Sequence, residues 1–202
     1  DGIYADTEIE ALHHAQGLPD SLPELWGFWG PRRAKISAAQ PNAGHLAVAA
    51  FQRASLRDGR EVTLATQNID DLHERAGSPQ VAHLHGSLFA TRCYDDSCPY
   101  RKNPDTSPYA EPPHCPICGS WLRPDVVLFG EPLGVDAQWT AKRAVRDCDL
   151  LRAVGTSGEV STAAGLIRYA VDVGALLVTV DPAPEVPASF DVHVPLPAEQ
   201  VL

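Results

Sequence analysis

Four cysteines in two close pairs constrain the fold of this chain more than any other feature. Four residues separate Cys93 from Cys98, two separate Cys115 from Cys118, and a polar, proline-rich stretch from Pro99 to His114 lies between the pairs. Two short turns with this spacing can present four thiolates to one tetrahedral ion. The pattern therefore predicts a structural Zn²⁺ site that is closed to water and not catalytic.

Disulfides or buried free thiols would use the same cysteines in other ways. The fifth cysteine, Cys148, would remain unpaired in an oxidising compartment, and no basic-plus-apolar leader is visible in the sequence. His114 lies next to Cys115 and could compete as a ligand, although four cysteines already complete a closed site. We therefore favour zinc and expect a cytoplasmic protein.

Apolar runs alternate with helical patterns along the chain. A helix is expected from Asn42 to Arg57, after Pro41, and another from Thr162 to Val173, ended by Gly174. Strands are expected at Val62–Ala65, Val126–Phe129, Leu150–Val154, Leu176–Val180 and Phe190–Val194. The third strand, the second helix and the fourth strand form a βαβ unit, which indicates an α/β fold with a parallel sheet.

The charge of the chain and the lengths of its apolar runs argue against two classes of partner. The 202-residue chain has a formal net charge of -10 and a pI near 5.1, so nothing offsets repulsion from a nucleic-acid backbone. No apolar run approaches the ~20 residues that a membrane-spanning helix needs. An acidic surface suits a basic partner such as a lysine-containing protein segment. The sequence leaves the oligomeric state open.

The first expected strand ends in a polar segment, Thr66 to His73. In open α/β sheets the carboxyl ends of the strands face the ligand. Gln67, Asn68 and Asp70 carry short hydrogen-bonding groups, which suit the hydroxyls and amide of a nucleotide cofactor. The alternative is a simple strand-to-helix cap.

A histidine and a small polar loop complete the candidate site. His85, within the segment His83 to Ser87, has a side chain whose ordinary pKa lies near neutrality, so it can take a proton from a sugar hydroxyl. The loop Gly155 to Ser157 follows the expected strand Leu150–Val154 directly. Considered singly, the histidine could be an ordinary loop residue and the loop an ordinary turn.

Together these segments resemble the sirtuin family of NAD-dependent protein-lysine deacylases, in its bacterial desuccinylase and deacetylase-type branch. The resemblance covers nearly the whole chain, and the family implies a Rossmann-like sheet with helices on both faces and an inserted zinc module. The implied NAD-binding domain is 1–88 with 122–202, and the implied zinc module is 89–121. The matching segments, besides the four cysteines, are Gln40-Pro41-Asn42-x-x-His45, Thr66–Gly77, His83-x-His85-Gly86, Leu122–Glu131 and Gly155–Ser157.

The resemblance also implies roles for particular residues. His85 matches the general base of the family. Cofactor contacts are implied for Gln67, Asn68, Asp70, Gly155, Thr156, Ser157 and Asp181, the last of which stands where the family commonly has Asn. Val127, Phe129, Gly130 and Glu131 match an extended segment that pairs with the backbone of the acyl-lysine substrate.

The implied reaction consumes NAD and releases nicotinamide, free lysine and O-acyl-ADP-ribose. Two other functions remain open. One is a catalytically weak protein that binds acyl-lysine or ADP-ribose. The other is an NAD hydrolase or ADP-ribosyltransferase, which shares nicotinamide cleavage but transfers to water or protein.

Two further departures from the family affect these expectations. The chain opens at Asp1-Gly2-Ile3-Tyr4, which resembles the Asp-Gly-Leu-Trp sequence that follows two segments of the family, Gly-Ala-Gly-x-Ser and then Gly-Ile-Pro-x-Phe-Arg. Either the sequence is truncated, or the protein is sirtuin-like and binds NAD weakly. The second departure concerns the Tyr-x-x-Arg pair that binds succinyl or malonyl carboxylates in one subgroup. Here Trp29 and Arg32 occupy those positions, so they are either acyl-pocket residues or a core Trp and a surface Arg.

Overall fold

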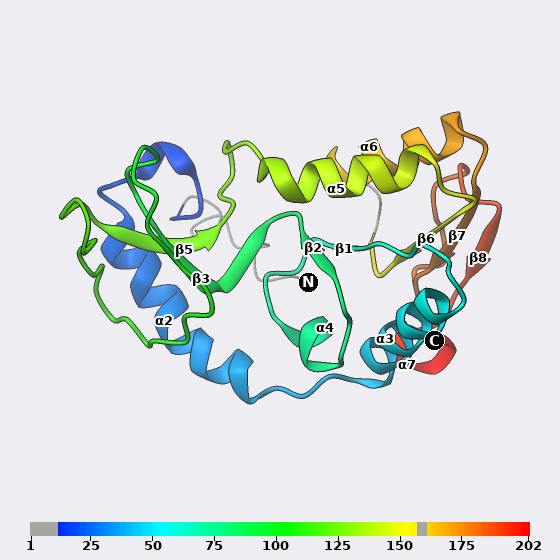
Figure 1. The fold of residues 1–202 in the computed structure, drawn as a ribbon, viewed down its shortest axis with the longest axis horizontal. Helices are drawn as coiled ribbons and strands as arrows, with labels where there is room; N and C mark the ends of the chain where they lie inside the picture. The colour runs from blue at the N-terminus through cyan, green and yellow to red at the C-terminus, as the bar shows by residue number, and fades with distance from the viewer. Residues whose placement is uncertain (1–11, 157–160) are drawn as a thin grey trace. The chain divides into compact units, whose positions relative to one another are not determined.

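The computed structural model describes residues 12–156 and 161–202 (Figure 1). The helices are η2 (Ala15–Gly17, a 3-10 turn), α2 (Leu22–Ala38), α3 (Ala43–Arg57), α4 (Leu72–Arg75), α5 (Val135–Arg146), α6 (Ser161–Asp172) and α7 (Ala198–Val201). The strands are β1 (Leu64–Thr66), β2 (Val81–His83), β3 (Gly86–Cys93), β4 (Arg101–Lys102), β5 (Leu122–Val126), β6 (Leu150–Val154), β7 (Leu176–Val180) and β8 (Val192–Val194). Within these described ranges, no helix is both long and apolar enough to cross a membrane.

The chain forms two compact units. One comprises the described residues up to Ala39 together with Thr66–Asp71 and His83–Gly134. The other comprises Gln40–Ala65, Leu72–Ala82 and Val135–Leu202. The division of the chain into an NAD-binding domain and a zinc module at 89–121 stays a prediction.

The first unit contains a three-stranded antiparallel sheet in the order β4-β3-β5, and α2 lies beside β3 and β5 (Figure 1). Trp26 of α2 donates its indole N–H to the carbonyl of Leu122 at 2.8 Å. Arg33, also on α2, is fully buried and donates to the carbonyls of Leu88 and Ala90. The apolar core of this unit comprises Leu22, Leu25, Trp29, Leu88, Val126 and Leu128. These contacts fix α2 against the sheet that leads to the candidate site.

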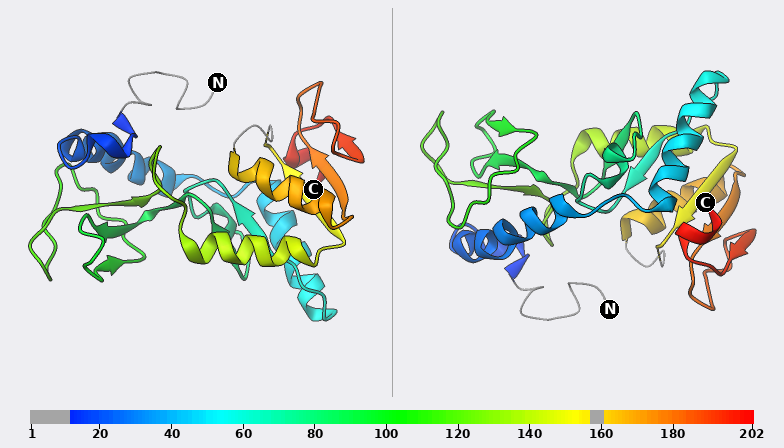
Figure 2. Two further views of the ribbon diagram at one scale, coloured as in Figure 1. Left: turned by 90° about the horizontal axis from the view of Figure 1, so that it is seen from above. Right: turned by 90° about the horizontal axis from the view of Figure 1, so that it is seen from below.

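The second unit contains the parallel sheet β6-β7-β8, with α6 packed on β7 and α5 packed on α6 (Figure 2). Gly174 ends the α6 region with φ +78°, a left-handed conformation in which glycine avoids the strain of a side chain. At the start of α3, the side chain of Asn42 accepts the backbone N–H of His45 at 3.0 Å. This cap explains where that helix begins.

The predicted parallel α/β fold is confirmed. The strands Leu150–Val154 and Leu176–Val180 have the predicted bounds, and the helices at α3 and α6 begin and end within one residue of prediction. β8 begins two residues later than predicted and β1 runs from Leu64 to Thr66. The strand predicted at Val126–Phe129 is wrong in position, because β5 covers Leu122–Val126 and only its last residue overlaps. β5 lies there because it pairs with β3 from Leu122 to Val126.

Candidate functional site

His85 lies in the short connection between β2 and β3, in the first unit. Its Nδ1 is 3.0 Å from the carbonyl oxygen of Gln67. A carbonyl only accepts, so Nδ1 carries the proton and Nε2 keeps its lone pair in the neutral ring. Burial lowers the pKa of His85 below its ordinary value, although the bond to Gln67 acts in the opposite direction. The histidine is therefore neutral and oriented as a base at neutral pH.

Backbone hydrogen bonds hold the predicted cofactor-binding segment beside the His85 region. Leu84 N–H donates to the carbonyl of Thr66 at 2.9 Å, and Leu88 N–H donates to that of Ile69 at 2.8 Å. Asn68 N–H is bound by the hydroxyl of Thr66 at 3.1 Å. The structure therefore places the short segment that carries Gln67, Asn68 and Asp70 alongside His85.

The segment after β5 also contacts the His85 region. Val127 N–H donates to the carbonyl of His85 at 2.9 Å. Phe129 N–H donates to the carbonyl of His13 at 2.8 Å, and the carbonyl of Phe129 accepts from Ala15 at 2.9 Å. Gly130 has φ +85°, and a Cβ there would lie 3.1 Å from the ring of His14, so only glycine fits without strain. Much of the hydrogen-bonding edge expected to receive substrate is thus paired within the chain.

The carboxylate of Glu131 is occupied by the chain itself. It pairs with the guanidinium of Arg123 and accepts the N–H of Leu128 at 2.9 Å. The sequence predicts no functional role for Arg123, although this residue lies within a segment that matches the family. The signal that could have found it is its charge: an arginine inside a strand that must be buried needs an anionic partner nearby.

The two residues at the predicted acyl-pocket positions have different environments. Trp29 is 1% exposed, belongs to the apolar core, and has an indole N–H without a hydrogen-bond partner among the described residues. Arg32 is partly exposed; its guanidinium lies 3.5 Å from the ring centre of Phe28 and donates to the Phe28 carbonyl at 2.8 Å. The core location of Trp29 agrees with the alternative that it is a packing residue. Contact of either residue with substrate stays a prediction.

The remaining predicted cofactor residues lie in the second unit. Gly155 and Thr156 follow β6, and Asp181 follows β7, so the parallel sheet places them at the same edge. Gly155 has φ +60° and donates its N–H to the carbonyl of Val180 at 3.0 Å. The carboxylate of Asp181 accepts the N–H of Ala183 at 2.8 Å. Ser157, the third residue of the predicted loop, lies outside the described residues.

The four paired cysteines come together in the first unit. Their sulfur atoms all lie within 4.8 Å of one another, with 3.5 Å from Cys93 to Cys118 and 3.7 Å from Cys98 to Cys115. Tetrahedral Zn–S bonds of about 2.3 Å place sulfur atoms about 3.8 Å apart, so the cluster fits a zinc ion. Desolvation opposes the thiolate of Cys115, yet bonds from backbone N–H groups and neighbouring thiols lower its pKa to about 7.

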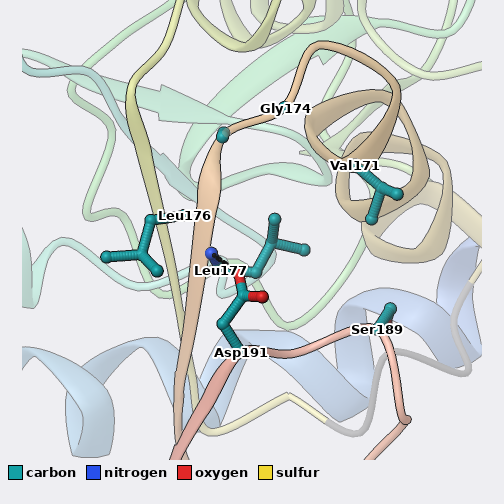
Figure 3. A pocket seen from close by; sticks show the side chains of 7 residues that line it. Val171, Gly174, Leu176, Leu177, Ser189 and Asp191 are labelled. Atoms are coloured by element: carbon teal, nitrogen blue, oxygen red, sulfur yellow. Dashed lines mark hydrogen bonds between the residues drawn. The ribbon is translucent and has the colours of Figure 1, made fainter.

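A separate cavity of about 440 Å³ lies at the amino ends of β7 and β8 (Figure 3). The lining residues are Val171, Gly174, Ala175, Leu176, Leu177, Ser189 and Asp191. The Asp191 carboxylate accepts the N–H of Leu177 at 2.8 Å. This cavity is at the edge of the sheet opposite to Gly155 and Asp181, so none of the predicted cofactor residues lines it.

Comparisons with known proteins agree with the sequence motifs. The Sir2 family model matches residues 1–162. The NAD-dependent protein deacylase 1 of Pseudomonas aeruginosa is 44% identical over 191 residues, which cover 91% of this chain and 74% of that protein. A Sir2 homologue solved in complex with NAD is 36% identical, with a TM-score of 0.85, over 96% of this chain and 74% of that one. A mutant Sir2 homologue bound to 2'-O-acetyl-ADP-ribose is also 36% identical, with a TM-score of 0.83, over 95% and 76% of the two chains.

Proposed function

The chain belongs to the Sir2 family, and on that basis we propose that it removes acyl groups from protein lysines with NAD as cosubstrate. One water is consumed, and the products are nicotinamide, free lysine and O-acyl-ADP-ribose. The observation that carries the proposal is the fixed orientation of His85, whose Nδ1 donates to Gln67 and whose Nε2 is left as the base. A related deacylase and a Sir2 homologue that binds NAD support this assignment.

Different residues of the chain have different roles in the reaction. NAD, when bound, would supply the ADP-ribosyl group that accepts the acyl group, with nicotinamide as its leaving group. His85 removes a proton from a ribose hydroxyl, which makes that oxygen able to attack the acyl carbon. Gln67, Asn68 and Asp70 bind the nicotinamide and its ribose. Their position on the segment that also orients His85 supports these roles.

The loop after β6 and the end of β7 contribute to binding the rest of the dinucleotide. Gly155, Thr156 and Asp181 stand at the carboxyl edge of a parallel sheet, where α/β folds bind nucleotides. We include Ser157 from the sequence motif alone. The zinc ion, held by the four cysteines, stabilises the fold around β3 and β5 and takes no part in the chemistry.

The backbone of the acyl-lysine substrate pairs, as an added strand, with the segment from Val127 to Gly130. Val127 and Phe129 already use their N–H groups within the chain, whereas the Val127 carbonyl and the Gly130 backbone have no partner among the residues described. Those remaining groups are the ones we assign to the substrate backbone. The basic character of lysine-containing segments suits a chain with net charge -10. The predicted cytoplasmic location, and the lack of nucleic-acid and membrane partners, stay predictions.

The pH dependence of the reaction should follow the protonation of the His85 side chain. Because burial lowers its pKa, the neutral base persists below pH 6.5, and activity is lost only as pH falls through the lowered value. We therefore expect the acidic limb of kcat/KM against pH to have its midpoint below 6.5. A limb centred above that value would contradict the environment that the structure gives to His85.

Acyl preference tests the role of Arg32. A guanidinium can form a charge-assisted fork with a succinyl carboxylate, worth roughly 1.5–3 kcal/mol, whereas an acetyl group offers no such partner. Arg32→Met keeps most of the stem and removes the charge. We expect this change to lower kcat/KM for succinyl-lysine peptide about tenfold relative to acetyl-lysine peptide. An unchanged ratio would mean that Arg32 stays with Phe28 and does not bind the acyl group.

Peptide dependence separates the proposed function from its alternatives. Incubated with NAD and an acetyl-lysine peptide, the protein should release nicotinamide only when the peptide is present, in step with its deacylation. Nicotinamide release without peptide would indicate an NAD hydrolase. Peptide binding without any nicotinamide release would indicate a catalytically weak binding protein.

A further inference from the structure

One largely buried ion pair closes the turn that follows β5. Arg123 is 2% exposed, and its guanidinium forms a two-pronged contact with the Glu131 carboxylate, with 3.0 Å from Nη2 to Oε2. The same Nη2 donates to the carbonyl of Val126 at 2.9 Å. Oε2 of Glu131 accepts the N–H of Leu128 at 2.9 Å. One guanidinium and one carboxylate therefore tie the start, the middle and the end of this turn together.

Arg92 cannot replace Arg123 in this arrangement. Its Nη2 lies 3.5 Å from Glu131 Oε1, but its side chain is 21% exposed and is also paired with Asp96 and Asp125. The guanidinium of Arg123 is almost fully buried, and Glu131 is the carboxylate that pairs with it among the described residues. Removing Glu131 would leave a buried cation uncompensated, so the turn would have to rearrange.

The tied turn carries the backbone groups nearest to the proposed chemistry. Val127, between the two backbone groups that the ion pair binds, donates its N–H to the carbonyl of His85. Gly130, just before Glu131, has the backbone groups that we assign to substrate. The conformation of the turn therefore sets both the substrate-binding backbone and one contact of the catalytic histidine's main chain.

We infer that Arg123 and Glu131 are positioning residues for the acyl-lysine peptide. They hold the turn from Val126 to Glu131 in the conformation that accepts the peptide backbone. Glu131 acts through Leu128 and Arg123 and does not touch the substrate. This inference rests on the proposed function, because it requires the turn to be the peptide-binding segment.

Two substitutions of Glu131 separate its two interactions. Glu131→Gln keeps an oxygen for the Leu128 N–H and loses the charge opposite Arg123, whereas Glu131→Ala loses both. We expect KM for an acetyl-lysine peptide to increase about threefold in the first variant and about tenfold or more in the second, the latter equal to about 1.4 kcal/mol. KM for NAD should stay within about twofold of the parent, because the cofactor residues lie on other segments.

Asp105→Asn is the matched control for lost stability. Asp105 forms an ion pair with the buried Arg33 and another with the half-exposed Lys102 in the same unit, and its hydrogen bonds among the described residues go to Lys102, Ser107 and Phe89 rather than to the turn. The Asp105→Asn variant should have a lower melting temperature, while its KM values for peptide and for NAD stay at the parent level. A role in folding alone would reduce the active fraction, which lowers apparent kcat and leaves KM unchanged.

The outcomes distinguish this inference from the proposed function. Suppose that the parent releases nicotinamide only with peptide, and that the folded Glu131 variants have the same KM for peptide as the parent. The inference is then overturned. If KM for NAD increases together with KM for peptide, the positioning role is also overturned. Should Glu131→Ala fail to fold, Glu131→Gln alone decides. A parent without peptide-dependent nicotinamide release would instead refute the proposed function.

Discussion

Replacing His85 by alanine should reduce kcat for deacylation by at least about 100-fold, the usual scale for the loss of a positioned general base. Nε2 is the group that accepts the ribose proton, because Nδ1 is committed to the Gln67 carbonyl. Alanine removes that base and leaves the backbone carbonyl of His85 available to Val127. Binding of NAD, measured by calorimetry, should persist because Gln67, Asn68 and Asp70 are unchanged.

His83→Gln is the matched control for this substitution. His83 lies two residues before His85, and its Nδ1 is 3.3 Å from the carbonyl of Asn68, a contact that a glutamine amide can replace. Deacylation by this variant should stay within about threefold of the parent, since no reacting proton passes through it. A His85→Ala protein that forms O-acyl-ADP-ribose at the parent rate would show that another group is the base.

Loss of zinc should be the largest effect on stability. Binding free energy at a four-cysteine site is folding free energy, about 10–16 kcal/mol in small zinc domains. We expect the purified protein to contain one zinc per chain, and Cys115→Ser to lose it. The melting temperature should fall by at least about 10 °C, because each kcal/mol shifts a chain of this size by roughly 2–4 °C.

Cys148→Ser is the matched control, because it removes a thiol that is not a zinc ligand. Cys148 lies in the second unit, outside the sulfur cluster, so this variant should keep both its zinc and its melting temperature. Elemental analysis of protein kept away from chelators measures the metal directly. Less than about half an equivalent of zinc would contradict the assignment, since a four-thiolate site binds zinc tightly.

The regular second half of the chain could be predicted because its signals are local. The apolar runs of β6 and β7 and the helical period of α6 are complete within a few residues, and Gly174 ends the helical segment. Asn42 likewise caps α3 with a neighbour three residues away. Such features need no knowledge of the rest of the fold.

The pairing of β3 with β5 could not be predicted in this way. β5 contains Arg123 and Asp125, charges that argue against a buried strand until their partners are known. Those partners are Glu131 for Arg123, and Arg92 and Arg101 for Asp125. The apolar residues that follow therefore predict a strand that begins four residues after the start of β5.

The candidate site shows the same division between local and long-range information. The motifs identified His85 and the four cysteines from residue type and spacing. They could not indicate that the Glu131 carboxylate is paired with Arg123, or that Trp29 lies in the core beside Leu88 and Val126. Each of these depends on contacts between segments that are distant in the sequence or on the direction of a side chain.

The central claim is that nicotinamide release and acyl transfer are one reaction on this protein. The most direct measurement is the stoichiometry of products, by mass spectrometry, after incubation with NAD and an acetyl-lysine peptide. We expect equal amounts of nicotinamide, deacylated peptide and O-acetyl-ADP-ribose. Nicotinamide with free ADP-ribose and an intact acetyl-lysine peptide would contradict it.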